Sequence, residues 1–387
     1  MNTVDTISDM KPKTKPVRIA LLFEYATLNG GERSMLACLD WLRIQHAELE
    51  FVAIAPADGR LSEALATRKI RVISWRSVDG PPALIDAIRL AEPTLLHANS
   101  LAMGRVTGRL ANQLTIPTTA HLRDIVHLSK AAMADLNRNQ RLIAVSQATR
   151  ELHISRGLDP DRVVVVRNGV DLEVFRPRPR QGGLHSELGL SADAILVATI
   201  GQIGLRKGQD TLAAAAPEIV RAIPNVHFLL VGERSSTKAE SIAFEQAISN
   251  QFARQGIASR LHQLGYRDDI ASLLNEIHLI VHPANQEPFG RVLLEGAASG
   301  LAVVATAVGG TPEIVIEGVT GRLVPPRAPQ LLAYAVAEVL RDADRRTAMG
   351  AAARHRAVEA FSIDRAAREL LEHWEAVLRD FQINCPA

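Results

Sequence analysis

Two glutamates separated by seven residues frame the most chemically informative segment of the chain. Glu287 and Glu295 stand at the ends of the sequence EPFGRVLLE, which follows an apolar run expected to be a strand. Pro288 and Gly290 predict that a helix begins between the two glutamates. Glu287 would then lie in the loop before the helix, free to contact a sugar, and Glu295 one to two turns inside it.

The start of this helix predicts an anion site. The backbone N–H groups of Phe289, Gly290 and Arg291 would point outward at a helix N-terminus, where a diphosphate binds readily. A carboxylate at Glu295 could accept hydrogen bonds from ribose hydroxyls, as acidic residues do in nucleotide-binding folds. On the spacing alone, a helix whose acidic first turn complements its dipole explains the pattern equally well.

Two further segments place glycine or histidine just after a predicted strand. Gly30 and Gly31 follow the first apolar run and open a helix, and glycine lets backbone approach a phosphate or sugar closely. A plain strand-to-helix turn is the alternative reading. His121 follows the strand expected at 117–120, although a lone histidine is commonly a structural residue.

Two D-x-D sequences raise the question of a metal site. A metal site that serves a diphosphate needs its aspartates just after a buried strand. Asp159 instead precedes a strand and Asp342 ends a helix, so we expect both to be turn or cap residues and expect neither a metal nor another cofactor.

Composition and missing motifs exclude several classes. The chain has no phosphate-binding G-x-x-x-x-G-K-[ST] loop, no G-x-S-x-G elbow and no H-E-x-x-H. Aromatic residues total 4%, and no basic run is interleaved with them, which disfavours nucleic acid. Two cysteines, Cys38 and Cys385, cannot build a disulfide framework.

Residues 1–180 hold 25 Lys and Arg against 19 Asp and Glu, so this half could face anionic lipid, but an ordinary solvated surface explains the charge as well. No apolar run is long enough to span a bilayer, so we expect a cytoplasmic protein with at most peripheral association at the inner membrane face.

The elements that must position these residues alternate between apolar runs and helical periods. With 387 residues, two domains are expected. Strands are predicted at 17–23, 51–55, 72–74, 95–97, 117–120, 142–146 and 162–167, with helices at 31–44, 101–113 and 147–156. A second series of strands is predicted at 195–200, 226–231, 260–264, 278–282 and 302–306. Such alternation predicts right-handed βαβ units on parallel sheets.

This pattern divides the chain into five parts. Residues 1–16 are expected to be a flexible leader and residues 17–175 a first domain around a parallel sheet. The Pro/Gly/Arg-rich segment 176–190 is expected to be a linker. Residues 191–365 form the predicted second domain, and the helix at 366–387 is expected to cross back to the first domain. Ligands of such sheets bind at the carboxyl ends of the strands. We therefore expect the ligand site in a cleft between the two domains.

The chain resembles glycosyltransferase family 4 from about Val17 to Phe361. Glu287 and Glu295 match the E-x7-E pattern of that family and its EPFG start. The combination of motifs is far more specific than any one of them. In chain order the further matches are AVSQATR (144–150), NGVD (168–171), Lys207-Gly208, His282-Pro283, GGTPE (309–313) and GVTG (318–321).

The resemblance implies an α/β protein of the GT-B fold, two Rossmann-like doubly wound domains facing each other across a cleft. It also implies that the first domain (17–175) binds the acceptor and the second (191–365) binds the nucleotide sugar. It implies transfer of a sugar from a nucleotide-diphosphate sugar, with retention and without a metal, in glycan, polysaccharide or glycoconjugate biosynthesis. Glu287, His121 and Lys207 would be catalytic, with Lys207 neutralising the diphosphate and Glu295 holding ribose. The family usually has an arginine at the position of Gln202, where it contacts the diphosphate. We expect Arg206 to supply that contact in this chain.

The sequence leaves the acceptor and two other classes open. A lipid-linked sugar, a polysaccharide end and a small metabolite all remain candidate acceptors. A nucleotide-sugar epimerase and a phosphorylase share this architecture, although no lysine lies in the context a phosphorylase cofactor needs. A non-catalytic nucleotide-sugar-binding protein is the third class. Glu287, Glu295 and Lys207 together argue against it. The oligomeric state is not readable.

Overall fold

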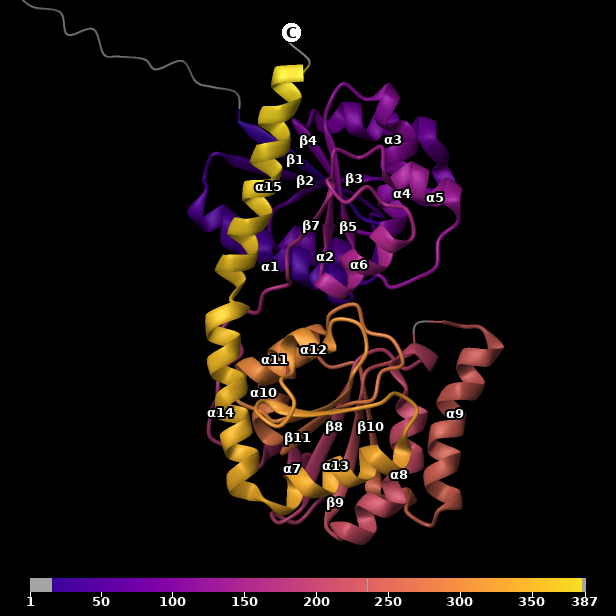
Figure 1. The fold of residues 1–387 in the computed structure, drawn as a ribbon, viewed down its shortest axis with the longest axis vertical. Coiled ribbons are helices and arrows are strands. Elements are labelled where there is room, and N and C mark those ends of the chain that lie inside the picture. The colour runs from indigo at the N-terminus through magenta and orange to yellow at the C-terminus, as the bar shows by residue number, and fades with distance from the viewer. Residues whose placement is uncertain (1–15, 235, 385–387) are drawn as a thin grey trace, which may run out of the picture.

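The computed structural model describes residues 16–234 and 236–384, which form two α/β domains, each built around a parallel sheet (Figure 1). The leader expected at 1–16 lies outside the described residues, apart from Pro16. No helix in the described part of the chain is both long and apolar enough to cross a membrane.

The first domain contains a seven-stranded sheet in the order β3-β2-β1-β4-β5-β6-β7. Its strands are β1 (Val17–Leu22), β2 (Leu49–Ala55), β3 (Arg71–Ser74), β4 (Leu95–Ala98), β5 (Thr118–Leu122), β6 (Arg141–Ala144) and β7 (Val163–Val165). Its helices are α1 (Gly30–Gln45), α2 (Gly59–Thr67), α3 (Gly80–Ala91), α4 (Leu101–Leu110), α5 (Lys130–Leu136) and α6 (Gln147–Ser155), with 3-10 turns η1 (Ser77–Asp79) and η2 (Ala111–Gln113). The strand order reverses between β1 and β4, which is the switch point where such folds bind ligands.

The second domain contains a six-stranded sheet in the order β10-β9-β8-β11-β12-β13. Its strands are β8 (Ile195–Ile200), β9 (Val226–Val231), β10 (Leu261–Gly265), β11 (Leu279–His282), β12 (Val303–Thr306) and β13 (Gly321–Val324). Its helices are α7 (Gly183–Glu187), α8 (Gln209–Ala222), α9 (Ala239–Arg254), α10 (Ile270–Glu276), α11 (Arg291–Ala298), α12 (Thr311–Ile314), α13 (Pro329–Arg341) and α14 (Ala343–Ala360), with η3 (Leu205–Lys207) and η4 (Ala258–Arg260). Here the order reverses between β8 and β11, the strands that lead to Lys207 and Glu287.

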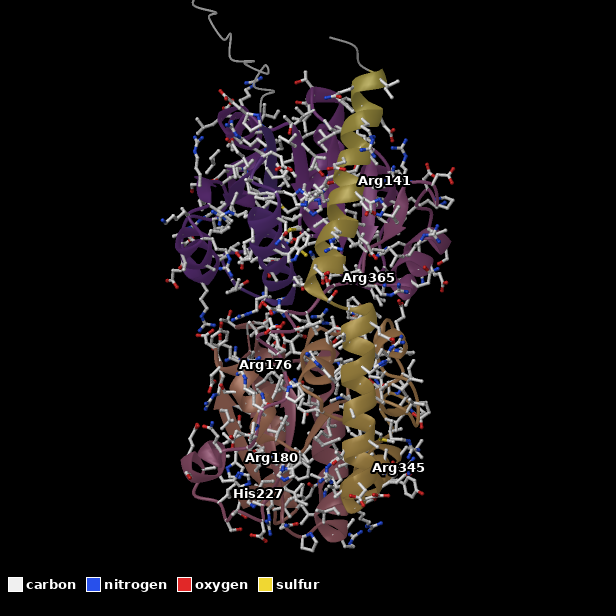
Figure 2. The ribbon with its side chains drawn as sticks, turned by 90° about the vertical axis from the view of Figure 1, so that its left-hand side faces the viewer. Arg141, Arg176, Arg180, His227, Arg345 and Arg365 are labelled. Carbon is white, nitrogen blue, oxygen red and sulfur yellow. The ribbon has the colours of Figure 1, made fainter. Side chains whose placement is uncertain are left out.

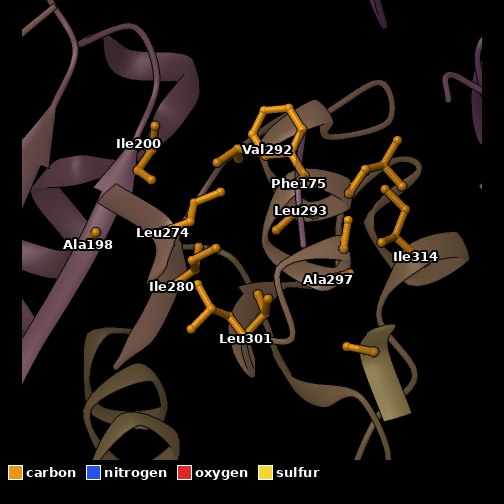
Figure 3. Packing of buried hydrophobic residues seen from close by; sticks show 14 of the residues in the cluster. Phe175, Ala198, Ile200, Leu274, Ile280, Val292, Leu293, Ala297, Leu301 and Ile314 are labelled. Carbon is orange, nitrogen blue, oxygen red and sulfur yellow. The ribbon is translucent and has the colours of Figure 1, made fainter. Parts of the chain in front are cut away.

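Each sheet is buried on both faces, as its nearly continuous apolar strands predict. In β1, residues Ile19 to Leu22 are fully buried. Alternate residues of β1 belong to different clusters, with Ala20 and Leu22 on one face and Ile19 and Leu21 on the other. Figure 3 shows part of the equivalent core of the second domain, where α11 packs on β11 and β12. The sheets are therefore rigid platforms for the loops at their ends.

The last helix returns to the first domain. After α14 packs along the second domain, α15 (Ile363–Asn384) lies against the first, and the two helices follow each other along one side of the molecule (Figures 1 and 2). Leu370, Trp374 and Val377 of α15 are buried in the cluster that contains Ile19 and Leu21. Arg141 lies beside α15 and pairs with Asp380 at 3.9 Å. The C-terminal segment thus spans both domains.

The segment expected to be a linker contains a helix that the sequence did not predict. Residues 176–182 are irregular, but α7 occupies Gly183–Glu187 inside the range 176–190. Leu184 is buried in the second-domain core, and His185 Nε2 is hydrogen bonded to the carbonyl of Ala194 at 2.9 Å. Burial of Leu184 stabilises a helix too short to form alone.

Candidate active site

The loops at the carboxyl ends of the two sheets meet at the boundary between the domains. Ser146, just after β6, donates a hydrogen bond from Oγ to the carbonyl of Pro288 at 2.6 Å. The side-chain amide of Gln286 donates to the carbonyl of Ile125, which follows β5. The loop after β11 therefore lies against the loops after β5 and β6, where the topology predicts a ligand site.

Glu287 lies at the centre of a buried polar cluster. Its Oε2 accepts a hydrogen bond from Lys207 Nζ at 2.5 Å and is 2.8 Å from His282 Nε2. His282 ends β11, and Lys207 ends η3 in the loop after β8, so adjacent strands of one sheet bring the three side chains together. Glu287 and His282 are 6% and 2% exposed. Two residues that were separately predicted to be catalytic, Glu287 and Lys207, are thus in direct contact.

The cluster keeps Glu287 ionised. Burial alone raises the pKa of a carboxyl, but the positive charge of Lys207 and the hydrogen bond from His282 outweigh it and hold the pKa of Glu287 well below its ordinary value. Burial lowers the pKa of His282, so its imidazole is neutral and donates from Nε2. The site therefore contains a negative carboxylate beside a lysine at neutral pH.

Helix α11 begins at Arg291, between the two glutamates as predicted. Gly290 is its cap residue, with φ of 111°, and the Phe289 side chain is buried against Phe361. Only the backbone of Phe289 and Gly290 can therefore face a ligand. Arg291 Nε donates to Glu295 Oε1 at 2.5 Å, so these two predicted donor-binding side chains pair with each other.

Arg206 reaches across the domain boundary. Its guanidinium lies 3.6 Å from Asp124, which follows β5 of the first domain. Gln202, in the same loop as Arg206, accepts a hydrogen bond at its backbone carbonyl from Gln209 at 3.0 Å. Arg206 thus lies beside Lys207 and next to the first domain, whereas Gln202 supplies no charge.

Gly30 and Gly31 open α1, as predicted, but their surroundings differ. A Cβ at Gly31 would lie 3.0 Å from Cδ of Arg123, whereas a Cβ at Gly30 would meet nothing within 4 Å. Glu32 Oε2 accepts a hydrogen bond from the backbone of Asn29 at 3.0 Å and fixes the start of the helix. Close packing against Arg123 explains why a glycine stands at position 31, whereas Gly30 borders open space.

His121 lies inside β5, one residue before its end, and not after the strand as predicted, because the strand continues to Leu122; it is 3% exposed. Its Nδ1 is 2.7 Å from Nε2 of His97 on β4. Burial, together with the charge of Arg123, lowers the pKa of His121 well below its usual value, so the ring is neutral. These contacts tie His121 to a neighbouring strand rather than to Glu287.

Both D-x-D sequences form local structure, as predicted. Asp159 accepts a hydrogen bond from the backbone of Asp161 at 3.0 Å, and Asp342 caps α14 by accepting from Arg345 at 2.9 Å. Within residues 16–234 and 236–384, no three His, Cys, Asp or Glu side chains gather as metal ligands.

A cavity of about 340 Å³ lies where the chain passes between the domains. None of the predicted site residues lines it. Its lining includes Arg167, Glu313, Arg356, Phe361 and Arg365.

Three polar residues near the site were not predicted as functional. His282 touches Glu287, Asp124 pairs with Arg206, and His97 touches His121. His282 carried a usable signal, because it ends a predicted strand five residues before Glu287. His97 carried none, since its contact with His121 spans 24 residues and depends on strand pairing.

The arrangement can stabilise a leaving anion. Lys207, Arg206 and Arg291 place three positive side chains around the loops after β8 and β11. Each one faces a carboxylate, so the pairs are preorganised and a bound diphosphate would share or displace those partners. Lys207 suits a developing point charge, and Arg206 suits a bidentate contact.

Two family models match the chain in succession. The model described as Glycosyltransferase Family 4 matches residues 28–174, and the model described as Glycosyl transferases group 1 matches residues 184–356. The first match runs from α1 to the residues after β7 and leaves out β1, and the second contains all six strands of the second sheet.

Similar proteins have related descriptions. The D-inositol 3-phosphate glycosyltransferase of Segniliparus rotundus is 31% identical over 314 residues, covering 74% of this chain and 67% of that protein. The alpha-maltose-1-phosphate synthase of Mycolicibacterium smegmatis is 36% identical over 248 residues, covering 61% and 63%. The chain thus matches about two thirds of the length of these relatives. The crystal structure of Anabaena HepE with UDP and glucose superposes with a TM-score of 0.83 at 25% identity, covering 92% of this chain and 99% of that one.

Proposed function

Because this chain belongs to glycosyltransferase family 4, we propose that it transfers a sugar from a uridine diphosphate sugar to an acceptor hydroxyl, with retention at the anomeric carbon and without a metal. Membership makes it a glycosyltransferase with a nucleotide-sugar donor. The uridine base is proposed from HepE, which was solved with UDP and glucose. A polyol or sugar acceptor is proposed from the relative whose name contains inositol 3-phosphate.

The contact that carries the proposal is the buried cluster of Glu287, Lys207 and His282. An ionised carboxylate beside a lysine, at the carboxyl edge of a parallel sheet, suits a polar sugar attached to a diphosphate. In this proposal Glu287 accepts hydrogen bonds from the donor sugar, and Lys207 pairs with the departing phosphate.

The diphosphate would bind between η3 and the start of α11. Lys207, Arg206 and the backbone N–H groups at residues 289–291 supply positive charge there. Donor binding exchanges the ion pair of Arg291 and Glu295 for contacts with phosphate and ribose. These groups neutralise the leaving group, which is the reason for proposing that no metal is needed.

In the proposed reaction the acceptor attacks on the face from which the diphosphate leaves. The bond between the anomeric carbon and the phosphate oxygen breaks, and a bond to the acceptor oxygen forms. The acceptor's proton passes to the departing diphosphate, so no protein base is required. Glu287 is held by Lys207 and His282 and acts as a stabilising charge rather than a nucleophile. A trapped covalent sugar on Glu287 would refute this role.

Thermal stability in the presence of donors tests the donor assignment first. The purified chain is heated with UDP-, GDP-, ADP- or dTDP-glucose, each with and without EDTA. A donor at 100 times its dissociation constant adds about 2.7 kcal/mol of apparent stability. Stabilisation by the UDP compound, unchanged by EDTA, is expected. Stabilisation by none of them contradicts the donor site.

Transfer itself is tested with UDP-sugars and a panel of polyol and sugar acceptors that includes inositol 3-phosphate. Proton NMR of fresh product reports the anomeric configuration. The expected product has the configuration of the donor, and the rate is unaffected by EDTA. An inverted product or loss of rate with EDTA would overturn the corresponding part of the proposal.

A further inference from the structure

A buried chain of hydrogen bonds runs from the last helix to His121. Trp374 of α15 donates from Nε1 to Nδ1 of His97 at 3.2 Å. Nε2 of His97 is 2.7 Å from Nδ1 of His121. Thr119 on β5 also contacts Nδ1 of His97, with its Oγ1 at 2.8 Å. The rings pack edge to face, with centroids 4.8 Å apart for the two histidines and 5.3 Å for His97 and Trp374.

The chemistry of these groups fixes where the hydrogens are. An indole N–H only donates, so Nδ1 of His97 must be the unprotonated nitrogen. A neutral imidazole carries one hydrogen, and in His97 it is therefore on Nε2 and is donated to Nδ1 of His121. His121 in turn holds its own hydrogen on Nε2. Thr119 does not decide this order, because a hydroxyl can donate or accept.

The chain is built to remain neutral. His97, Thr119 and Trp374 are fully buried, and His121 is nearly so. Burial, with the charge of Arg123, lowers the pKa of His97 to about 3 and lowers that of His121 as well. Neither ring carries a second proton at neutral pH, so the hydrogen-bonding character of His121 depends on its tautomer.

We propose that Trp374 and His97 are positioning residues that hold His121 as the Nε2–H tautomer, so that His121 donates a hydrogen bond to an oxygen of the donor sugar. The proposal rests on the proposed function for the identity of that oxygen. With Nδ1 occupied and Nε2 protonated, neutral His121 has no free lone pair with which to act as a base. Trp374 in the C-terminal helix thereby determines which ring nitrogen of His121 carries the hydrogen.

The tautomer can be measured without any substrate. The full chain is labelled with 15N-histidine, and long-range proton–nitrogen NMR correlations identify the protonated nitrogen of each ring. His97→Gln and His121→Asn variants assign the two signals. Both rings are expected in the Nε2–H form. An Nδ1–H form of His121 in the unaltered chain overturns the proposal, whether or not the chain proves to be a transferase.

Removing the N–H group of Trp374 tests whether this donor determines the tautomers of His97 and His121. Trp374→Phe keeps an aromatic ring but removes the N–H, and Thr119 then supports either tautomer of His97. The signals of His97 and His121 should become mixtures of both forms. Thr119→Val leaves the indole donor in place and should leave both tautomers unchanged. Retention of pure Nε2–H forms in Trp374→Phe contradicts the assigned role of Trp374.

A kinetic comparison separates positioning from packing. Trp374→Phe should lower kcat/KM for transfer roughly tenfold, the loss expected for one misoriented hydrogen bond. Phe51→Leu serves as the packing control, because Phe51 packs on the same indole with ring centroids 6.4 Å apart and takes no part in the hydrogen bonds. Equal losses in the two variants would show a purely structural effect and would refute the proposal.

Discussion

Glu287 supplies the negative charge of the buried cluster that it forms with Lys207 and His282. Glu287→Gln keeps the volume and an acceptor oxygen but removes the charge that faces Lys207 and His282. We expect kcat for transfer to fall by about a hundredfold or more, the usual effect of removing one preorganised electrostatic group. Steady-state transfer assays measure it.

The matched control for this substitution is Glu187→Gln. Glu187 also pairs with a positively charged side chain, Arg267 at 2.5 Å, but it lies in α7 and is half exposed. Its replacement should leave kcat unchanged. Circular dichroism and thermal melting of both variants show whether each is folded. A folded Glu287→Gln enzyme with full turnover would exclude the role proposed for this carboxylate.

His97 makes stability depend on pH in the mildly acidic range. Its pKa is about 3 when folded and about 6.5 when unfolded, so below pH 6.5 the unfolded chain binds a proton that the folded chain does not. The free energy of unfolding therefore decreases as the pH is lowered below 6.5. For this group the slope approaches about 1.4 kcal/mol per pH unit between about pH 5.5 and the folded pKa. Above pH 6.5 it has no such effect.

The pH slope can be attributed by substitution. Urea unfolding at pH 7.5, 6.5 and 5.5 is compared for the unaltered chain and for His97→Gln. Between pH 6.5 and 5.5 the variant should lose about 1 kcal/mol less stability than the unaltered chain. His355→Gln, at an exposed histidine of α14, should not change the slope. Equal slopes for His97→Gln and the unaltered chain would contradict the prediction.

At the residue scale, the sequence predicted the parts of the site that lie close together along the chain. Glu287, Arg291 and Glu295 belong to one motif, and the helix start between the glutamates is confirmed. Contacts between distant segments were not predictable. Trp374 and His97 are 277 residues apart, and nothing in either local pattern marks them as partners. The roles of the predicted residues remain predictions.

The loop that carries Glu287 depends on a second loop behind it. Gly309 has φ of 51°, and a Cβ there would lie 1.9 Å from the carbonyl oxygen of Glu287. Gly309→Ala should therefore displace Glu287 and lower kcat at least tenfold, because small displacements of reacting groups are costly. Transfer assays on the folded variant measure the loss.

Gly318→Ala is the matched control for Gly309→Ala. Gly318 also has a left-handed backbone, with φ of 73°, but a Cβ there meets nothing within 4 Å. Both variants incur the backbone strain of about 1 kcal/mol, whereas only one collides. Gly318→Ala should keep its activity. If both lose activity equally, strain rather than collision is responsible.

At the element scale, strands and long helices were predicted better than short helices. β9 has the predicted bounds, because a buried strand is a continuous apolar run. The helix expected at 101–113 ends at Leu110 and continues as a 3-10 turn. α2, α5 and α7 have nine residues or fewer, too few to show a helical period clearly.

At the scale of the whole molecule, the two domains are joined by side chains at their facing edges. Arg60 of α2 pairs with Glu233 after β9 at 2.7 Å, and its guanidinium lies 3.8 Å from the ring centre of Tyr266. Arg33 of α1 pairs with Asp268 at 3.3 Å. The paired-domain architecture was predicted from strand–helix alternation, but these contacts between distant residues were not.

The pair of Arg60 and Glu233 is about half exposed, so it contributes about 1 kcal/mol or less to holding the domains together. Arg60→Glu should still increase the open population, by up to about fivefold, since it replaces attraction with repulsion. Open domains admit water, so hydrolysis of the donor should rise relative to transfer. Small-angle X-ray scattering reports the accompanying increase in radius of gyration.

The double variant Arg60→Glu with Glu233→Arg restores opposite charges. It should restore both the radius of gyration and the ratio of hydrolysis to transfer. If the single variant changes neither the scattering nor the hydrolysis ratio, the pair does not stabilise the closed arrangement.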